Sequence, residues 1–229
     1  LQKESMDNYC DTDILIIVDS LNSDMGLYKE LLSKNIQIIV LDHHMINNTI
    51  DTDAITLVSS ANQYPNKQLS GSGVTWKFCM YLDKVLNTNY AMQYVDLATS
   101  GIISDMCDVS EDSMENRYIC DQGFKNIKNL GLKQINGNYA FDSTSISFGI
   151  APLINAACRS NQNKLAANVF LTDNIKDTKN YILTLKRYKE EQKNQVKAML
   201  PEIIQQTNKQ INSKVIYIQI KENFELAGL

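Results

Sequence analysis

The two histidines of this 229-residue chain are adjacent, and their surroundings are the clearest sign of chemistry in the sequence. His43 and His44 follow Asp42, which ends an apolar run, and an earlier apolar run ends in Asp19. Because the carboxyl ends of neighbouring parallel strands meet at one edge of a sheet, we expect Asp19 to lie beside this pair. Carboxylates mixed with imidazoles suit Mn²⁺, Zn²⁺ or iron, and a carboxylate-rich set favours Mn²⁺ or Mg²⁺. The alternative is an adjacent pair that lies at the surface by chance or caps a helix.

A further carboxylate, Asp105, ends the apolar segment 97–104. It is a further candidate carboxylate for the site. Asp108 is a rival for this role, and the local alternative is a helix-end aspartate that faces solvent. Two metal ions held by such a set can activate water and stabilise the leaving oxygen in phosphodiester hydrolysis.

The elements that must position these residues are short strands and a helix. Apolar runs bounded by polar residues predict strands, and the helical spacing of Met25–Asn35 predicts a crossover helix between the first two of them. Strands separated by such a helix form a parallel sheet, so the fold class is α/β. The predicted strands are Asp13–Asp19, Ile36–Asp42 and Ala54–Ser60.

The pattern after residue 71 is helical. The segment from Lys176 to about Ile211 is long and polar, and we interpret it as a connecting helix outside the core, which Pro201 should end or kink. Val215–Ile220 then predicts a strand that opens a second α/β domain. The resulting domains are 1–172, 173–212 and 213–229. The other predicted helices are Gly73–Leu86, Ala91–Ile103, Ser113–Asn129, Leu153–Ala157 and Lys164–Leu171.

Composition and charge bound the class of protein. Hydrophobic residues make up 44% and charged residues 21%, which is typical of a soluble globular protein. The net charge is −10 over residues 1–120 and +6 over residues 121–229, so the second half is the better place for phosphates. No apolar run is long enough to span a membrane, and five cysteines without a CxxC pair favour the reducing cytoplasm. The first ten residues have no apolar core or initiator Met, so we expect a fragment without a signal peptide.

Several short motifs together resemble the DHH phosphoesterase superfamily, and within it the RecJ-like single-strand exonucleases. LDHH follows one strand and VDS ends the strand before it. Four more elements follow in the family's order, and the resemblance covers roughly residues 19–159. These elements are SGSGV at Ser70–Val74, DLxxxGxxxD at Asp96–Asp105, ENR at Glu115–Arg117 with Gly123, and INAACR at Ile154–Arg159.

The resemblance implies a role for particular positions. It assigns metal coordination to Asp19, Asp42, His43 and Asp105, with Mn²⁺ or Mg²⁺ as the metal and two ions in the complete protein. It implies catalytic roles for Asp42, His43, His44 and Arg159, which coordinate metal or orient the ligands and the scissile phosphate. It implies phosphate or nucleic-acid contacts for Ser72, Gly73, Asn155, Arg159 and Arg117.

Three departures from the family pattern stand out. The family's first motif, an Asp-x-Asp-Gly loop, is not found, because neither Asp11–Asp13 nor Asp51–Asp53 has the glycine or the right order. Since that motif supplies carboxylates to both metals, we expect an incomplete metal centre. Cys158 replaces a glycine of the phosphate motif and Leu153 stands where an arginine is often found, so one phosphate contact is expected to be missing.

The resemblance implies a 5′→3′ exonuclease acting on single-stranded DNA in recombination or repair, with a single-strand-binding protein or a helicase as protein partner. In that family residues 1–172 correspond to the DHH catalytic domain, 173–212 to its connecting helix and 213–229 to the start of the DHH-associated domain. Two alternatives stay open. One is a phosphoesterase of small substrates such as oligonucleotides, cyclic dinucleotides or pyrophosphate, and the other is a non-catalytic scaffold of replication complexes.

Overall fold

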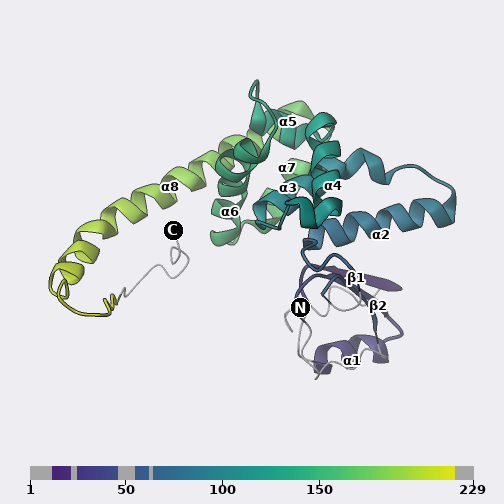
Figure 1. Ribbon diagram of the computed structural model, residues 1–229, viewed down its shortest axis with the longest axis horizontal. Helices are drawn as coiled ribbons and strands as arrows, with labels where there is room; N and C mark the ends of the chain where they lie inside the picture. Colours follow the sequence, from purple (N-terminus) through teal and green to yellow (C-terminus); the bar gives the residue numbers. More distant parts are fainter. Residues whose placement is uncertain (1–11, 22–24, 46–54, 62–63, 220–229) are drawn as a thin grey trace. The chain divides into compact units, whose positions relative to one another are not determined.

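The computed structural model describes residues 12–21, 25–45, 55–61 and 64–219 (Figure 1). Its contacts divide the chain into two compact units, 1–129 and 130–229. The first unit holds β1 (Ile14–Val18), α1 (Met25–Ser33), β2 (Gln37–Asp42), β3 (Thr56–Ser59), α2 (Gly71–Leu86), α3 (Val95–Ser104) and α4 (Met114–Lys125), with short 3₁₀ turns at Ala91–Tyr94 and Glu111–Ser113. The second unit holds α5 (Leu130–Asn136), a π-helical segment (Ser145–Ile150), α6 (Ala151–Arg159), α7 (Asn163–Leu171) and α8 (Ile175–Asn208).

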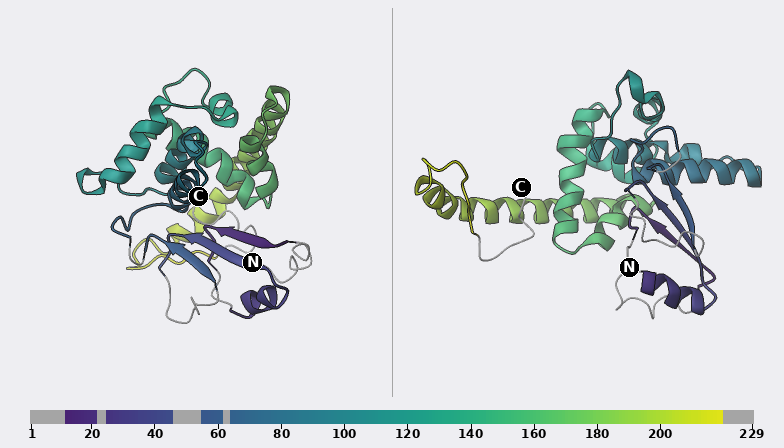
Figure 2. Two further views of the ribbon diagram at one scale, coloured as in Figure 1. Left: turned by 90° about the vertical axis from the view of Figure 1, so that its right-hand side faces the viewer. Right: turned by 60° about the horizontal axis from the view of Figure 1, so that its bottom comes forward.

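The three strands form one parallel sheet in the order β1-β2-β3, as predicted (Figure 2). In the register, Val18 pairs with Leu41 and Asp42 pairs with Ser59. The backbone N–H of Asp19 also donates to the carbonyl of Leu41, at 2.8 Å. All three strands therefore end at the same edge of the sheet, and this edge holds Asp19, Asp42 and the residues that follow them.

Helices cover both faces of the sheet. Alternate residues of a strand point to opposite faces. On one face, Ile38 and Val40 pack against Tyr28 and Leu31 of α1. On the other, Leu41 belongs to a second core with residues of α2, α3 and α4, among them Trp76, whose indole Nε1 donates to the carbonyl of Ala91. The predicted α/β fold is confirmed, and the helices of the second core are the elements that can bring further side chains to the strand ends.

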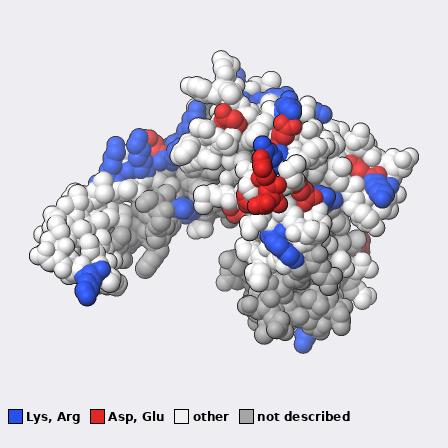
Figure 3. All heavy atoms as spheres, in the orientation of Figure 1, with Lys and Arg blue, Asp and Glu red and all other residues white. Residues whose placement is uncertain are grey.

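The second unit is helical, as the sequence pattern predicts. Its core joins α6, α7 and the first half of α8 through Leu153, Val169, Ile182 and Leu185. This corrects our interpretation of the segment after 173, because Ile182 and Leu185 are buried and therefore make α8 part of a core. The polar majority of α8 hid the few apolar residues that recur at helical spacing. Basic side chains gather along this helix (Figure 3).

Pro201 does not end α8, which continues to Asn208. A proline within a helix leaves the carbonyl four residues earlier without its N–H partner. That residue is Lys197, which is exposed, so water can hydrogen-bond its carbonyl. Of the two predicted effects of Pro201, the helix end is therefore excluded, and a kink stays a prediction.

The predicted strand Val215–Ile220 is not observed over its described residues, 215–219. Its backbone instead pairs with two glutamine side chains, Gln206 in α8 and Gln210 just after its end. Gln210 exchanges two hydrogen bonds with Tyr217, and Gln206 does the same with Gln219. The side-chain amides thus supply the hydrogen bonds that a neighbouring strand would supply in a sheet.

Two further observations bear on the predicted organisation. The division near residue 129 differs from the boundary at 172 that the sequence suggests, and the latter stays a prediction. No helix among the described residues is both long and apolar enough to cross a bilayer.

Candidate metal centre

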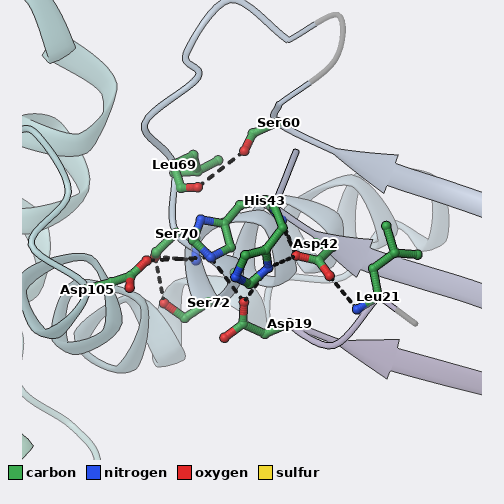
Figure 4. Close-up of polar contacts among 12 residues, drawn as sticks. Asp19, Leu21, Asp42, His43, Ser60, Leu69, Ser70, Ser72 and Asp105 are labelled. Atoms are coloured by element: carbon green, nitrogen blue, oxygen red, sulfur yellow. Dashed lines mark hydrogen bonds and ion pairs between the residues drawn. The ribbon is translucent and has the colours of Figure 1, made fainter. Parts of the chain in front are cut away.

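The strand ends bring two carboxylates and two imidazoles together (Figure 4). One ligand atom from each of Asp19, Asp42, His43 and His44 lies within 4.8 Å of the other three. His43 Nε2 is 3.2 Å from Asp19 Oδ1, and the two histidine rings lie 4.5 Å apart between centroids. Asp19 adopts a positive φ of 52°, which turns the chain sharply at the end of β1. The parallel register therefore produces the cluster that the sequence predicted.

Asp42 is fully buried and organises the turn after β2. Its Oδ1 accepts hydrogen bonds from the backbone N–H of His43 at 2.6 Å and of His44 at 3.0 Å, and its Oδ2 accepts one from the N–H of Leu21 at 2.6 Å. Burial alone would raise the pKa of Asp42, but these hydrogen bonds and one from the His44 ring outweigh it and hold the pKa below its usual range. Asp42 thus remains an anion that orients the loop carrying both histidines.

The pKa values of His44 and Asp19 are both raised at this site. His44 Nδ1 lies 2.6 Å from Asp42 Oδ1, and this hydrogen bond raises the pKa of the imidazole. The same bond fixes the ring, so that Nε2 is directed away from Asp42. Burial raises the pKa of Asp19, although the charge of His43 partly opposes it. A cation bound here would favour the deprotonated carboxylate, because metal ligands must lose their protons to bind.

Asp105 directly follows α3, one of the helices of the second core, and reaches the cluster from the end of this helix. Its Oδ2 is 3.5 Å from His43 Nε2. The rival candidate, Asp108, has another task, because its carboxylate accepts hydrogen bonds from Ser110 and Ser113 and so fixes the start of α4. Of the two, Asp105 is the carboxylate beside His43.

The start of α2 forms a further wall of the site. Ser70 caps this helix, and its Oγ accepts a hydrogen bond from Gly73 N at 3.2 Å. Gly71 abuts Asp19 so closely that a Cβ at this position would overlap the carboxylate. A cavity of about 440 Å³ opens beside Asp19, lined on this side by Gly71 and Ser72. The glycine is therefore needed for the close approach of α2 to the cluster.

The predicted phosphate contacts of this segment differ in their surroundings. The hydroxyl of Ser72 is partly exposed and bonds Ser70 Oγ and the carbonyl of Ala98. Gly73 is buried against Leu69, and its N–H already donates to Ser70. This geometry supports a packing role for Gly73, so Ser72 is the remaining phosphate candidate here.

The other predicted phosphate contacts lie on helices. Arg117 is exposed on α4 of the first unit, whereas Asn155 and Arg159 lie one turn apart on α6 of the second. Asn155 is exposed and Arg159 is partly buried. Within the described residues, Nη1 of Arg159 is the buried side-chain nitrogen that lacks a hydrogen-bond partner. Leaving a buried charged donor unpaired is costly, so this atom is available to an anionic partner.

A polar network on α4 links the segment before α2 to the segment after α3, and the sequence pattern did not predict it. Glu115 accepts hydrogen bonds from Tyr64 at 2.5 Å, Lys77 at 2.7 Å and Asn66 at 3.1 Å. The neighbouring Asn116 is fully buried. The ENR motif marked these positions, but the partners of Glu115 lie 38 to 51 residues earlier in the chain and could not be identified from the motif.

Glu115→Gln should change how stability depends on pH. Burial alone would raise the pKa of Glu115, but hydrogen bonds from Lys77, Tyr64 and Asn66 outweigh it and lower the pKa. A carboxylate with a lowered folded pKa stabilises the fold above its unfolded pKa, and this stabilisation is lost as pH falls through the folded value. We expect the variant to be less stable at neutral pH and to lose less stability on acidification.

Urea unfolding from about pH 7 to about pH 3 measures this difference. The exposed Glu111→Gln serves as the control and should follow the unmodified protein. Parallel stability curves for Glu115→Gln and the unmodified protein would contradict the assignment.

The donor set fits a divalent metal ion. Carboxylate oxygens from Asp19 and Asp105 and imidazole nitrogens from the histidines are ligands that Mn²⁺ and related ions accept. They come from the ends of β1, β2 and α3, and a carboxylate-rich set of this kind has excess negative charge that a cation would offset. Asp11 and Asp51–Asp53 lie outside the described residues.

Comparison with known proteins agrees with this geometry. The sequence profile of the DHH family, N-terminal domain, matches residues 1–102. YorK of Bacillus subtilis strain 168, described as a candidate single-strand DNA-specific exonuclease of SPbeta prophage origin, is 34% identical over 155 residues, which are 65% of this chain and 27% of YorK. The solved structure of an exonuclease RecJ bound to manganese superposes with a TM-score of 0.80 at 25% identity, over 90% of this chain and 54% of that one. Residues 1–102 thus resemble the N-terminal domain of the DHH family, and the fold resembles that of RecJ over 90% of the chain.

The RecJ relationship extends beyond the DHH motif itself. The single-stranded-DNA-specific exonuclease RecJ of Thermus thermophilus is 25% identical over 210 residues, covering 90% of this chain and 31% of the relative. The chain thus spans less than a third of the curated relatives YorK and RecJ. The second unit, with α5–α8, lies within the part that resembles RecJ rather than outside it.

Proposed function

We propose that this chain carries the metal-binding part of a RecJ-like exonuclease, which removes nucleotides from the 5′ end of single-stranded DNA. The observation that carries the proposal is the convergence of Asp19, Asp42, His43 and Asp105 at one sheet edge in a RecJ-like fold. The names of YorK and RecJ specify single-stranded DNA as the substrate of those proteins. A role in recombination or repair belongs to the same proposal.

Asp19, His43 and Asp105 would hold a Mn²⁺ or Mg²⁺ ion, with Asp42 as a further ligand or as the anchor of both histidines. Two ions in the complete protein are part of the proposal. A bound ion supplies an activated water and offsets charge on the phosphate. The residues of the chain hold the metal-binding side chains in place: Asp42 fixes the turn after β2, and its hydrogen bond to His44 orients the imidazole. In this arrangement His44 can donate a proton or a hydrogen bond to a phosphate oxygen.

The arginine on α6 supports phosphate binding by the second unit. Its unpaired Nη1 can be satisfied by a phosphate oxygen, and a guanidinium fork matches phosphate geometry. Asn155 lies four residues earlier on α6 and can contribute an amide to the same ligand. We propose that Asn155 and Arg159 contact the substrate backbone, while Arg117 and Ser72 remain further candidates on the first unit.

The decisive experiment follows the two ends of a single-stranded oligonucleotide. The intact protein receives 5′-labelled and 3′-labelled strands with Mn²⁺, with Mg²⁺ and with EDTA. We expect metal-dependent release of 5′ mononucleotides, with no release in EDTA. Hydrolysis that saturates at very short substrates would favour a small-substrate phosphoesterase. Retention of DNA in EDTA without cleavage under any condition would favour a scaffold.

Arg159→Ala should weaken the binding of single-stranded DNA. Loss of a charge-assisted hydrogen bond costs about 1.5–3 kcal/mol, so the dissociation constant should rise by about tenfold or more. Arg187→Ala is the matched control, because Arg187 is an exposed arginine of the same unit that pairs with Glu191 and stacks on Tyr188. Fluorescence anisotropy in EDTA measures binding without cleavage. Equal affinities for the two variants would remove Arg159 from the binding surface.

A further inference from the structure

Asn116 connects two loops that are separated in the sequence. Its side chain is completely buried on α4. The amide nitrogen donates to the carbonyl of Gln68 and to the carbonyl of Asp108, both at 2.8 Å. The amide oxygen accepts from Nδ2 of Asn66 at 2.9 Å. Both hydrogens and the oxygen of one amide are therefore used between the segment before α2 and the segment after α3.

Each of these loops adjoins a residue that lines the metal centre. The segment that contains Asn66 and Gln68 leads directly to Ser70 and Gly71, and Gly71 abuts the carboxylate of Asp19. The segment that contains Asp108 begins at Asp105, whose Oδ2 lies 3.5 Å from His43 Nε2. A shift of either loop would therefore move a group that touches a proposed metal ligand.

The residue before Asn116 reinforces the same connection. Glu115 binds Asn66, Tyr64 and Lys77, so two consecutive residues of α4 hold the loop before α2. Asn66 also accepts a hydrogen bond from Gln68 N at 3.0 Å, which fixes the backbone between them. On the other side, the carboxylate of Asp108 binds Ser110 and Ser113 at the start of α4. Both loops are thus fastened to α4.

We propose that Asn116 is a positioning residue of the metal centre: through Gln68 and Asp108 it sets the separation between the start of α2 and Asp105. The inference rests on the proposed metal site and adds to it a residue that touches neither metal nor substrate. Small displacements are sufficient, because groups that orient metal ligands typically change metal affinity by about 10- to 100-fold when they are lost.

The test measures Mn²⁺ binding to the intact protein by electron paramagnetic resonance, together with the thermal midpoint of unfolding without metal. We expect Asn116→Ala to weaken Mn²⁺ binding by about tenfold at a temperature where the variant is folded. Asn126→Ala is the matched control, since Asn126 ends the same helix and its amide nitrogen donates only to Gln122 within that helix. A residue that only packs the core would lower the thermal midpoint and leave the affinity of the folded protein unchanged.

A second variant decides the outcome if Asn116→Ala does not fold. Asn66 is only partly buried, and Asn66→Ala removes its own hydrogen bonds to Asn116 and Glu115 and the one that it accepts from Gln68 N, so it loosens the backbone that holds the Gln68 carbonyl against Asn116 without leaving a cavity inside α4. We expect it also to weaken Mn²⁺ binding. Unchanged Mn²⁺ affinity in either folded variant overturns the inference, whatever the thermal midpoint. Normal Mn²⁺ binding by the unmodified protein without nuclease activity would instead contradict the proposed function and leave this inference standing.

Discussion

His43→Ala is expected to lower the metal-dependent nuclease rate of the intact protein by more than about a hundredfold. His43 is the residue that both carboxylates approach, with Nε2 at 3.2 Å from Asp19 and 3.5 Å from Asp105. Even groups that only orient metal ligands are worth about 10- to 100-fold, so a central ligand should exceed that. Its removal takes away the nitrogen at the point where the two carboxylates meet.

Asp105→Asn extends this test to the carboxylate from α3. The substitution preserves shape but removes the charge, so we expect a comparable loss of rate and weaker Mn²⁺ binding. Asp121→Asn is the matched control, because Asp121 is an exposed aspartate of the first unit that pairs with Lys125, one turn away on the same helix. Rates are measured on 5′-labelled single strands with saturating Mn²⁺, and far-UV circular dichroism checks the fold.

Full nuclease rates for both His43→Ala and Asp105→Asn would contradict the assignment of the metal centre. Loss of rate in Asp121→Asn to the same degree would show instead that the first unit tolerates no change of charge. His43 follows β2 and Asp105 follows α3. Because these elements are different, a shared loss of Mn²⁺ affinity would show that the two residues act on one site.

Gly71→Ala is the second substitution with a large expected effect. In a helix, alanine is ordinarily more stable than glycine by roughly 0.5–1 kcal/mol. Here the new methyl group would overlap the Asp19 side chain at Oδ1, Cγ and Cβ. Either Asp19 or the start of α2 must then move, and both line the metal centre. We therefore expect Mn²⁺ affinity and nuclease rate to fall by about tenfold or more.

Gly149→Ala is the matched control, since a Cβ at Gly149 would meet no atom within 4 Å. Its Mn²⁺ affinity should equal that of the unmodified protein. Mn²⁺ binding by Gly71→Ala at the unmodified level would mean that α2 does not confine Asp19. Comparing metal affinity with the unfolding midpoint separates displacement of the ligand from a general loss of stability.

Part of the site could be predicted because it depends on local pattern and on one general property of parallel sheets. Apolar runs that end in Asp19 and Asp42 indicated strands, and strands joined by a helix indicated a parallel sheet. The carboxyl ends of such strands share an edge, so the proximity of Asp19 to the His pair followed without knowledge of the packing. The motif order similarly placed Asp105 in the site before its position was known.

Some predictions failed where a distant or weak signal decided the structure. The polar composition of α8 concealed Ile182 and Leu185, which recur at helical spacing and lie in the core. Pro201 is tolerated because α8 is exposed there, and exposure is not a local property of the sequence. The helix α5 was not predicted, since it has only seven residues and is stabilised by its neighbours more than by its own pattern.

The sequence by itself determined the three strands, the pair of histidines after the second strand and the family motifs, because these depend on neighbours along the chain. Only the tertiary structure decided which groups meet across long separations. It brought Asp105 to 3.5 Å from His43, set Gly71 against Asp19, and joined Gln68 to Asp108 through Asn116. These contacts arise when helices pack on a sheet face, and the spacing of side chains in the sequence does not specify the distance at which they pack.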